Sequence, residues 1–378
     1  MEFRDLKRQY LQNKDRIDEA IAEVLQHTNF ISGRQVAELE EQLASYVERK
    51  YCIACANGTD ALQLALMAMN VGEGDAVFVP DFTFFSTAEV VSLCKATPVF
   101  IDVLEDTFNM NPVSLEEAIN KILVEGRLIP KVIIPVDLFG LPADYSKIEA
   151  IADKYDLDIL EDGAQGFGGN IRDKKACSFG KISTTSFFPA KPLGCYGDGG
   201  ALFTDDDELA ELIRSLRVHG KGHDKYDNIR IGLNSRLDTI QAAILKVKLD
   251  VFISTELDAV NRVADWYSKE LEDIVKVPVI PEGYYSSWAQ YSILLASKEE
   301  RDGLVMYLKE HDIPSMVYYR MPMHMQGAFN EENSVHLGCP VTESVCDRVL
   351  ALPMHPYLSQ DELNVVARAV KEYVARRV

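Results

Sequence analysis

The stretch YCIACANGTDALQLALMAMNVGEGDAVFVPDFTFFSTAEVVSLCKATPVFI, residues 51–101, contains the pattern that decides the fold. Its apolar runs at 52–55, 76–79 and 97–101 have the length of strands and alternate with segments of helical periodicity. Strands that are apolar on both faces and separated by helices are typical of a parallel sheet covered on its two sides. We therefore predict an α/β fold.

The same alternation continues as far as about residue 250. Further strands are predicted at 132–136, 158–160, 183–188 and 200–204. Helices are predicted at 14–26, 61–69, 86–94, 115–123, 148–155, 206–216 and 236–249. Beyond residue 250 the pattern changes to a long helix, 258–271, followed by short mixed signals. We predict a large domain with a mostly parallel sheet over residues 1–250 and a smaller α/β domain over residues 251–378.

The composition limits the partners of the chain. Its 378 residues include 39 lysines and arginines against 59 aspartates and glutamates, for a net charge of −20. Surfaces that bind nucleic acid or anionic membranes need an excess of cations, so we expect neither partner. Every apolar run is too short to span a membrane, and the charged N-terminus lacks the apolar core of a signal peptide.

The cysteine pattern indicates a reducing compartment. Seven cysteines are scattered along the chain, which does not resemble a disulfide framework. Cys52 and Cys55 form a C-x-x-C pair, but no second pair at zinc-ligand spacing accompanies it. A buried strand that uses cysteine as a small apolar residue is the favoured interpretation. We predict a cytoplasmic protein without a metal site.

Three loops that directly follow predicted strands carry residues suited to chemistry, because α/β sheets bind ligands at the carboxyl ends of their strands. The sequence NGTD places Gly58 and Thr59 at a helix start, which is either an anion site or an ordinary N-cap turn. Residues 161–165, EDGAQ, offer two carboxylates for a metal, a general base or a solvated loop. Lys191, followed by a glycine-rich turn, is either a nucleophilic amine or a surface lysine.

Taken together, the three loops specify one chemistry. A pyridoxal phosphate site needs a phosphate cup, a carboxylate for the pyridinium nitrogen and a lysine that forms a covalent link with the cofactor. The cup at Gly58, then Asp162, then Lys191 follow one another along the alternating strands in the order such a site requires. A lyase or aldolase that uses a lysine without a cofactor would need neither Asp162 nor the cup.

A family resemblance is carried by six segments: NGTDAL (57–62), PDFTFFSTAE (80–89), VDLFGLPADY (136–145), LEDGAQGFGG (160–169), SFFPAKPLGCYGDGGA (186–201) and GLNSRLDTIQAAIL (232–245). In this order they resemble the DegT/StrS-type sugar aminotransferases, which are fold type I enzymes that depend on pyridoxal phosphate. The similarity extends from FISGRQVAELE (30–40) to ALPMHPYLSQD (351–361). It implies an aspartate aminotransferase-like fold with a large and a small domain.

The resemblance implies roles for four residues around the cofactor ring. Lys191 is expected to link to the cofactor and to carry the proton between the substrate carbon and the cofactor. Asp162 is expected to pair with the pyridinium nitrogen. Gln165 would donate a hydrogen bond to the phenolic oxygen of the ring. Phe84 would lie on the ring face, although a phenylalanine in the core is the alternative.

The resemblance also implies how the phosphate is held. Gly58, Thr59 and Ser186 are expected to contact it within one subunit. Asn234 is expected to reach the phosphate from the neighbouring subunit. The protein should therefore be a homodimer in which both chains contribute to each active site.

Within the family, FFPAKPLGCYGDGG and NSRLDTIQAAIL are most similar to UDP-2-acetamido-2-deoxy-hexuluronate 3-aminotransferases. This implies that glutamate aminates C3 of a keto-sugar with a C6 carboxylate, for surface polysaccharides such as lipopolysaccharide. Arg236 is expected to bind that carboxylate bidentately, unless it forms an ion pair on a helix surface. Tyr318 and His324 match positions near the sugar.

Two alternatives remain open. The first is a substrate of another kind, either a neutral keto-sugar, such as a dTDP-3-keto-6-deoxyhexose, or a UDP-4-keto-sugar. A more remote alternative is a regulator that binds pyridoxal phosphate without turnover, although the chain shows no added DNA-binding segment.

Overall fold

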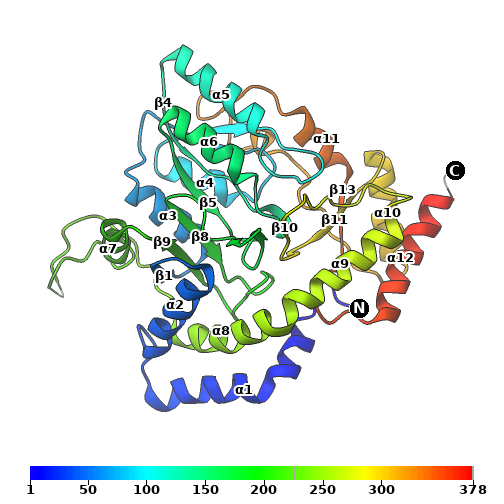
Figure 1. Cartoon of the computed structure of the whole chain (residues 1–378), viewed down its shortest axis with the longest axis horizontal. Coiled ribbons are helices and arrows are strands. Elements are labelled where there is room, and N and C mark those ends of the chain that lie inside the picture. The colour runs from blue at the N-terminus through cyan, green and yellow to red at the C-terminus, as the bar shows by residue number, and fades with distance from the viewer. Residues whose placement is uncertain (225, 377–378) are drawn as a thin grey trace.

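The computed structural model describes residues 1–224 and 226–376. An eight-stranded sheet forms its central layer, with helices on both faces (Figure 1). The strands, in order across the sheet, are β1 (Tyr51–Cys55), β9 (Gly200–Thr204), β8 (Ile182–Ser186), β5 (Asp158–Asp162), β4 (Ile129–Ile133), β2 (Asp75–Pro80), β3 (Thr97–Ile101) and β12 (Val335–His336). Only β9 runs antiparallel to its neighbours in this sheet. The predicted α/β fold with a mostly parallel sheet is confirmed.

Side chains along each strand alternate between two hydrophobic cores. In β1, Ile53 belongs to the core on one face and Ala54 to the core on the other. The first face is covered by α3 (Gly58–Ala68), α4 (Ser86–Leu93) and α7 (Asp207–Leu216). The second is covered by α2 (Arg34–Val47), α5 (Pro112–Glu125), α6 (Tyr145–Tyr155) and α8 (Thr239–Val251). Because both faces are buried, most strands are largely apolar. Strand β8 is the exception, with Ser183, Thr184 and Thr185 buried.

The N-terminal region contains α2 in addition to the helix predicted there. Helix α1 (Leu6–His27) is longer than the predicted segment 14–26 and lies against α8 (Figure 1). No helix was predicted at α2, although its apolar residues recur with helical spacing and are buried. These residues are Val36, Leu39, Leu43 and Val47.

Several predicted boundaries are shifted by a few residues. Strand β4 ends at Ile133 and not at residue 136, because Pro135 has no amide to donate to the ladder. The helix predicted from residue 236 begins at Thr239, after Asp238 in the N-cap position. The other short elements are β6 (Asn170–Ile171), β7 (Lys174–Lys175), β10 (Tyr284–Tyr285), η1 (Leu138–Gly140) and η3 (Met323–Met325).

The C-terminal part has a hydrophobic cluster of its own. Strands β11 (Tyr291–Leu294) and β13 (Val349–Leu352) pair antiparallel within it. The helices of this part are α9 (Leu257–Leu271), α10 (Lys298–Glu310), α11 (Pro340–Arg348) and α12 (Gln360–Ala375). Helix α8 continues through the π-helical turn η2 (Phe252–Glu256) directly into α9. The division into domains near residue 250 therefore stays a prediction.

The cysteines fit the strand interpretation. All seven are free thiols. Cys52 and Cys55 are buried in β1 and lie in different cores, since they are an odd number of residues apart. They therefore face away from each other and cannot share a metal ion. In the described residues no helix combines the length and the apolar character needed to cross a bilayer.

Candidate active site

The residues predicted to bind the cofactor ring and phosphate meet at the carboxyl edge of the sheet. Gly58 follows β1, Asp162 ends β5 and Ser186 ends β8. Lys191 lies in the loop that connects β8 to β9. Parallel strands end at the same edge, so residues distant in sequence come together there.

The start of α3 forms a cup for an anion. Asn57 is its N-cap, and the first amides of a helix have no helical acceptor and carry the positive end of the dipole. A Cβ on Gly58 would lie 2.7 Å from Cβ of Ser186, so only glycine lets these two loops meet. The hydroxyls of Thr59 and Ser86 are 2.8 Å apart. Ser86, which the sequence analysis did not single out, therefore belongs to the cup, and this cup fits a phosphate group.

Asp162 is a buried carboxylate held by hydroxyls. Its Oδ2 accepts a hydrogen bond from Oγ1 of Thr87 at 2.8 Å, and Oδ1 accepts one from the amide of Ala164 at 3.2 Å. Oγ1 of Thr83 lies 3.0 Å from Oγ1 of Thr87. Burial raises the pKa of Asp162, against these hydrogen bonds and the charge of Lys191. A protonated ring nitrogen beside the carboxylate would compensate for the burial, so the site fits a pyridinium.

The Lys191 loop is packed against the phosphate cup. A Cβ on Gly200, at the end of this loop, would lie 2.5 Å from the backbone of Asn57. The amide of Lys191 donates to the carbonyl oxygen of Phe188 at 2.8 Å. Burial lowers the pKa of the Lys191 amine to about 8, although Asp162 opposes the shift. An amine with this pKa is available as a nucleophile near neutral pH.

Three side chains form one wall of the site. Oε1 of Gln165 accepts a hydrogen bond from the amide of Phe139 at 3.0 Å, and Nε2 donates to Oη of Tyr319 at 3.3 Å. The ring of Phe84 lies 6.5 Å from that of Tyr319 and is 54% exposed. Such exposure does not fit the alternative of a core phenylalanine. It fits a ring available to a flat ligand.

The sequence analysis selected Tyr318, whereas its neighbour Tyr319 contacts Gln165. The ring of Tyr318 lies 6.2 Å from that of Phe3, edge to face. Nothing in the sequence separates two adjacent tyrosines in a loop. The structure therefore adds Tyr319 to the candidate site and places Tyr318 beside the N-terminus.

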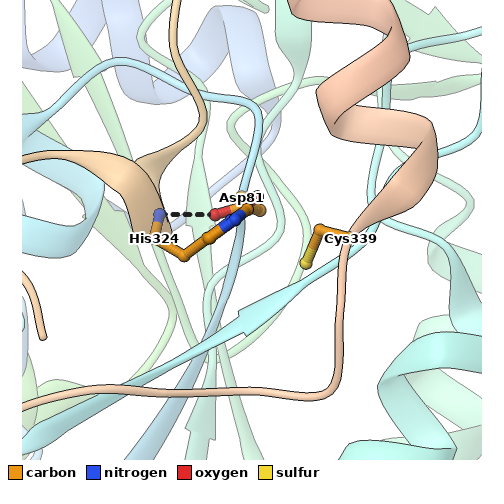
Figure 2. Close-up of side chains that lie close together, drawn as sticks. All are labelled: Asp81, His324 and Cys339. Carbon is orange, nitrogen blue, oxygen red and sulfur yellow. Dashed lines mark hydrogen bonds and ion pairs between the residues drawn. The ribbon is translucent and has the colours of Figure 1, made fainter. Parts of the chain in front are cut away.

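His324 pairs with an aspartate of its own chain. Its Nδ1 lies 2.6 Å from Oδ2 of Asp81, and its amide donates to Oδ1 at 2.8 Å (Figure 2). Its Nε2 lies 3.7 Å from Oε1 of Glu343. Both ring nitrogens therefore face carboxylates, so a sugar contact through the ring would require one of them to be released.

Cys339 lies near this pair but does not complete a metal site (Figure 2). Ligand atoms of Asp81, His324 and Cys339 lie within 4.8 Å of one another. Two ligands of one tetrahedral zinc ion, each about 2.1 Å from the metal, are roughly 3.4 Å apart. The 2.6 Å between Asp81 and His324 is instead a hydrogen-bond distance. The geometry indicates an ion pair.

This ion pair predicts a pH-dependent stability. The hydrogen bond that His324 donates to the Asp81 carboxylate raises the pKa of His324 above its ordinary value. The pair therefore stabilises the fold fully below about pH 6.5 and loses this effect as the pH rises through the raised pKa. We expect His324→Gln to lower the free energy of unfolding more at about pH 6 than at about pH 9. Denaturant unfolding at both pH values measures this, and Asp81→Asn should reproduce it. An equal loss of unfolding free energy at both pH values would show that His324 and Asp81 do not stabilise the fold as an ion pair.

Asn234 and Arg236 lie outside this group. Nη2 of Arg236 donates to Oδ1 of Asn234 at 2.7 Å, on the segment between α7 and α8 that projects from the body of the molecule (Figure 1). Arg236 lines a surface hollow of about 760 Å³. Within the described part of the chain no hydrogen bond or ion pair joins either residue to Lys191 or Asp162 of the same chain. The structure of one chain does not bring these two into the site.

The fold and the site define an aminotransferase dependent on pyridoxal phosphate. Residues 11–371 match the family model described as the DegT/DnrJ/EryC1/StrS aminotransferase family. The chain belongs to this family.

Individual relatives cover nearly the whole chain. The UDP-2-acetamido-2-deoxy-3-oxo-D-glucuronate aminotransferase of Pseudomonas aeruginosa is 44% identical over 98% of this chain and 99% of its own. A DegT/DnrJ/EryC1/StrS aminotransferase from Brucella abortus superposes with a TM-score of 0.96 at 50% identity, covering 99% of both chains. NtdA from Bacillus subtilis, solved with bound cofactor PMP, gives a TM-score of 0.86 at 28% identity, over 96% of this chain and 82% of that one.

Proposed function

We propose that this enzyme transfers the amino group of L-glutamate to C3 of UDP-2-acetamido-2-deoxy-3-keto-hexuronate. The observation that carries the proposal is the end-to-end similarity to the aminotransferase named for a 3-oxo-glucuronate substrate. From that substrate class we infer that the enzyme acts in the cytoplasm and contributes to the synthesis of a surface glycan, such as lipopolysaccharide. The seven free thiols agree with a reducing compartment.

The chemistry assigns a task to each residue at the carboxyl edge of the sheet. Bound pyridoxal phosphate supplies an electron-withdrawing ring that stabilises negative charge on the carbon that loses or gains the amino group. Asp162 would keep the ring nitrogen protonated, and Gln165 would donate a hydrogen bond to the phenolic oxygen of the ring. Nζ of Lys191, whose pKa burial lowers to about 8, takes the proton from the reacting carbon and returns it. Phe84 covers the ring face and excludes water.

Phosphate binding requires a second copy of the chain in this proposal. Gly58, Thr59, Ser86 and Ser186 surround the cup of one subunit without a formal positive charge. Asn234 is exposed, as expected of a residue that reaches across to a partner. We therefore propose a homodimer in which Asn234 and Arg236 complete the partner's site.

Arg236 provides the test of the substrate. If it binds the C6 carboxylate, Arg236→Ala should lower kcat/KM about 10- to 100-fold for the uronate, the loss of a charge-assisted hydrogen bond of about 1.5–3 kcal/mol. Activity toward the matching sugar with a neutral C6 group should change little. Steady-state kinetics with both substrates and glutamate measure the difference. The exposed Arg262→Ala on α9 is the control for loss of a positive charge.

The alternatives give different results in this experiment. If the substrate is a neutral dTDP-3-keto-6-deoxyhexose or a UDP-4-keto-sugar, the unmodified enzyme prefers it and Arg236→Ala affects both substrates equally. If the protein is a regulator without turnover, glutamate yields no 2-oxoglutarate with any keto-sugar. Either result would contradict the proposed substrate.

A further inference from the structure

The N-terminal segment contacts the loop that carries Lys191. Nη2 of Arg4 donates a hydrogen bond to the carbonyl oxygen of Lys191 at 2.8 Å. The carbonyl oxygen of Phe3 accepts one from the amide of Met354 at 3.1 Å. The segment therefore joins the Lys191 loop to the C-terminal part of the chain.

The same segment is fastened by the start of α1. Nη1 of Arg8 donates to the carbonyl oxygen of Tyr357 at 2.5 Å. Its two terminal nitrogens each lie 3.1 Å from an oxygen of Glu362, which is the bidentate geometry of a strong ion pair. Residues 3–8 are thus held in place on the side away from Lys191.

Arg4 faces a buried carboxylate in an unusual turn. Glu256, in the π-helical turn η2, contributes to the environment of Arg4 together with Tyr357 and Tyr318. Nε2 of Gln9 donates to both oxygens of Glu256, at 3.0 and 3.2 Å, and the hydroxyl of Tyr357 donates to it as well. Such π-helical turns inside helices are frequent at functional sites. Glu256 is therefore a nearby negative charge that favours the charged form of the Arg4 guanidinium.

Two charges of opposite sign act on the Lys191 amine. Asp162 favours its charged form, whereas Arg4 favours its neutral form. Lys248, a further buried cation, interacts with Glu256 and Arg4. Arg4 is the cation that also contacts the backbone of Lys191 directly.

We propose that Arg4 is a positioning residue for Lys191: its guanidinium fixes the backbone of the lysine loop, and its charge favours the neutral amine. The inference rests on the proposed role of Lys191 as the residue that links to the cofactor. A substitution at Arg4 should therefore change how readily the amine links to pyridoxal phosphate, even before any substrate is present.

The test follows this linkage without turnover. Protein freed of cofactor is mixed with pyridoxal phosphate over a range of pH, reduced with borohydride at set times, and the labelled Lys191 peptide is quantified by mass spectrometry. The rate of linkage is plotted against pH, and the pH at which it reaches half its maximum is taken as the midpoint. For Arg4→Met we expect this midpoint to move to higher pH, and linkage at neutral pH to be severalfold slower. Arg4→Lys keeps the charge but not the planar donor group, so its midpoint should stay near that of the unmodified protein while linkage is slower at every pH.

Lys7→Met is the matched control, since Lys7 is exposed on the same segment. It should behave as the unmodified protein. If Arg4→Met keeps its melting temperature and shows the unmodified midpoint and rate, Arg4 does not position Lys191. A lower melting temperature with no change in midpoint would also overturn the inference, because a merely structural role predicts it. If the unmodified protein yields no labelled Lys191 peptide, the proposed role of Lys191 fails instead.

Discussion

Lys191→Ala is expected to abolish covalent retention of pyridoxal phosphate and to lower kcat by about 10³-fold or more, since it removes both the linking amine and the group that moves the proton. The physical reason is the placement of this amine. It lies near Asp162 at the carboxyl edge of the sheet, where burial lowers its pKa to about 8 and leaves it reactive near neutral pH. Visible absorbance after desalting measures retention, and glutamate consumption measures turnover.

Lys248→Met is the matched control for Lys191→Ala. Burial lowers the pKa of Lys248 to about 8 as well, but its amine lies 5.0 Å from the ring centroid of Tyr196 and interacts with Glu256. The Lys248 variant should retain the covalent cofactor. Retention of the covalent link by Lys191→Ala would show that another lysine carries the cofactor.

Asp162→Asn is expected to lower kcat about 10²- to 10³-fold, the range found when one preorganised electrostatic group is removed. The amide keeps the shape and can still accept a hydrogen bond from Thr87, but it no longer holds a proton on the ring nitrogen. The ring then withdraws electrons less strongly from the reacting carbon. Cofactor linkage at Lys191 should persist, so single-turnover kinetics of the loaded protein isolate the chemical effect.

Asp158→Asn provides the comparison for Asp162→Asn. Asp158 begins the same strand, β5, and pairs with Lys181 at 3.0 Å on the exposed surface. The same chemical change there should leave kcat near that of the unmodified enzyme. A rate for Asp162→Asn equal to that of Asp158→Asn would remove Asp162 from the proposed chemistry.

The sequence was sufficient for most of the sheet because strands such as β1, β3 and β9 are largely apolar. Ile53 and Ala54 face different cores, so neither position tolerates a polar residue, and the pattern is visible without a structure. Helix α2 was not predicted, although its apolar residues recur with the spacing of one helix face. The end of β4 depends on Pro135 and could have been predicted from the missing amide.

The cofactor site was predictable where its residues lie at the ends of strands. Its supporting contacts were not, because they join positions far apart in the sequence. Thr87 is 75 residues from Asp162, and Arg4 is 187 residues from Lys191. Neither pairing leaves a local pattern. The contact of Tyr319 with Gln165 likewise depends on the path of the loop in three dimensions.

The most direct measurement offers the loaded enzyme a panel of keto-sugar nucleotides with glutamate and identifies the products by mass spectrometry. From UDP-2-acetamido-2-deoxy-3-keto-hexuronate we expect the 3-amino sugar and one equivalent of 2-oxoglutarate. The kcat/KM for neutral sugars and for 4-keto-sugars should be much lower. No amino sugar from the uronate, while a neutral sugar is aminated efficiently, would contradict the account.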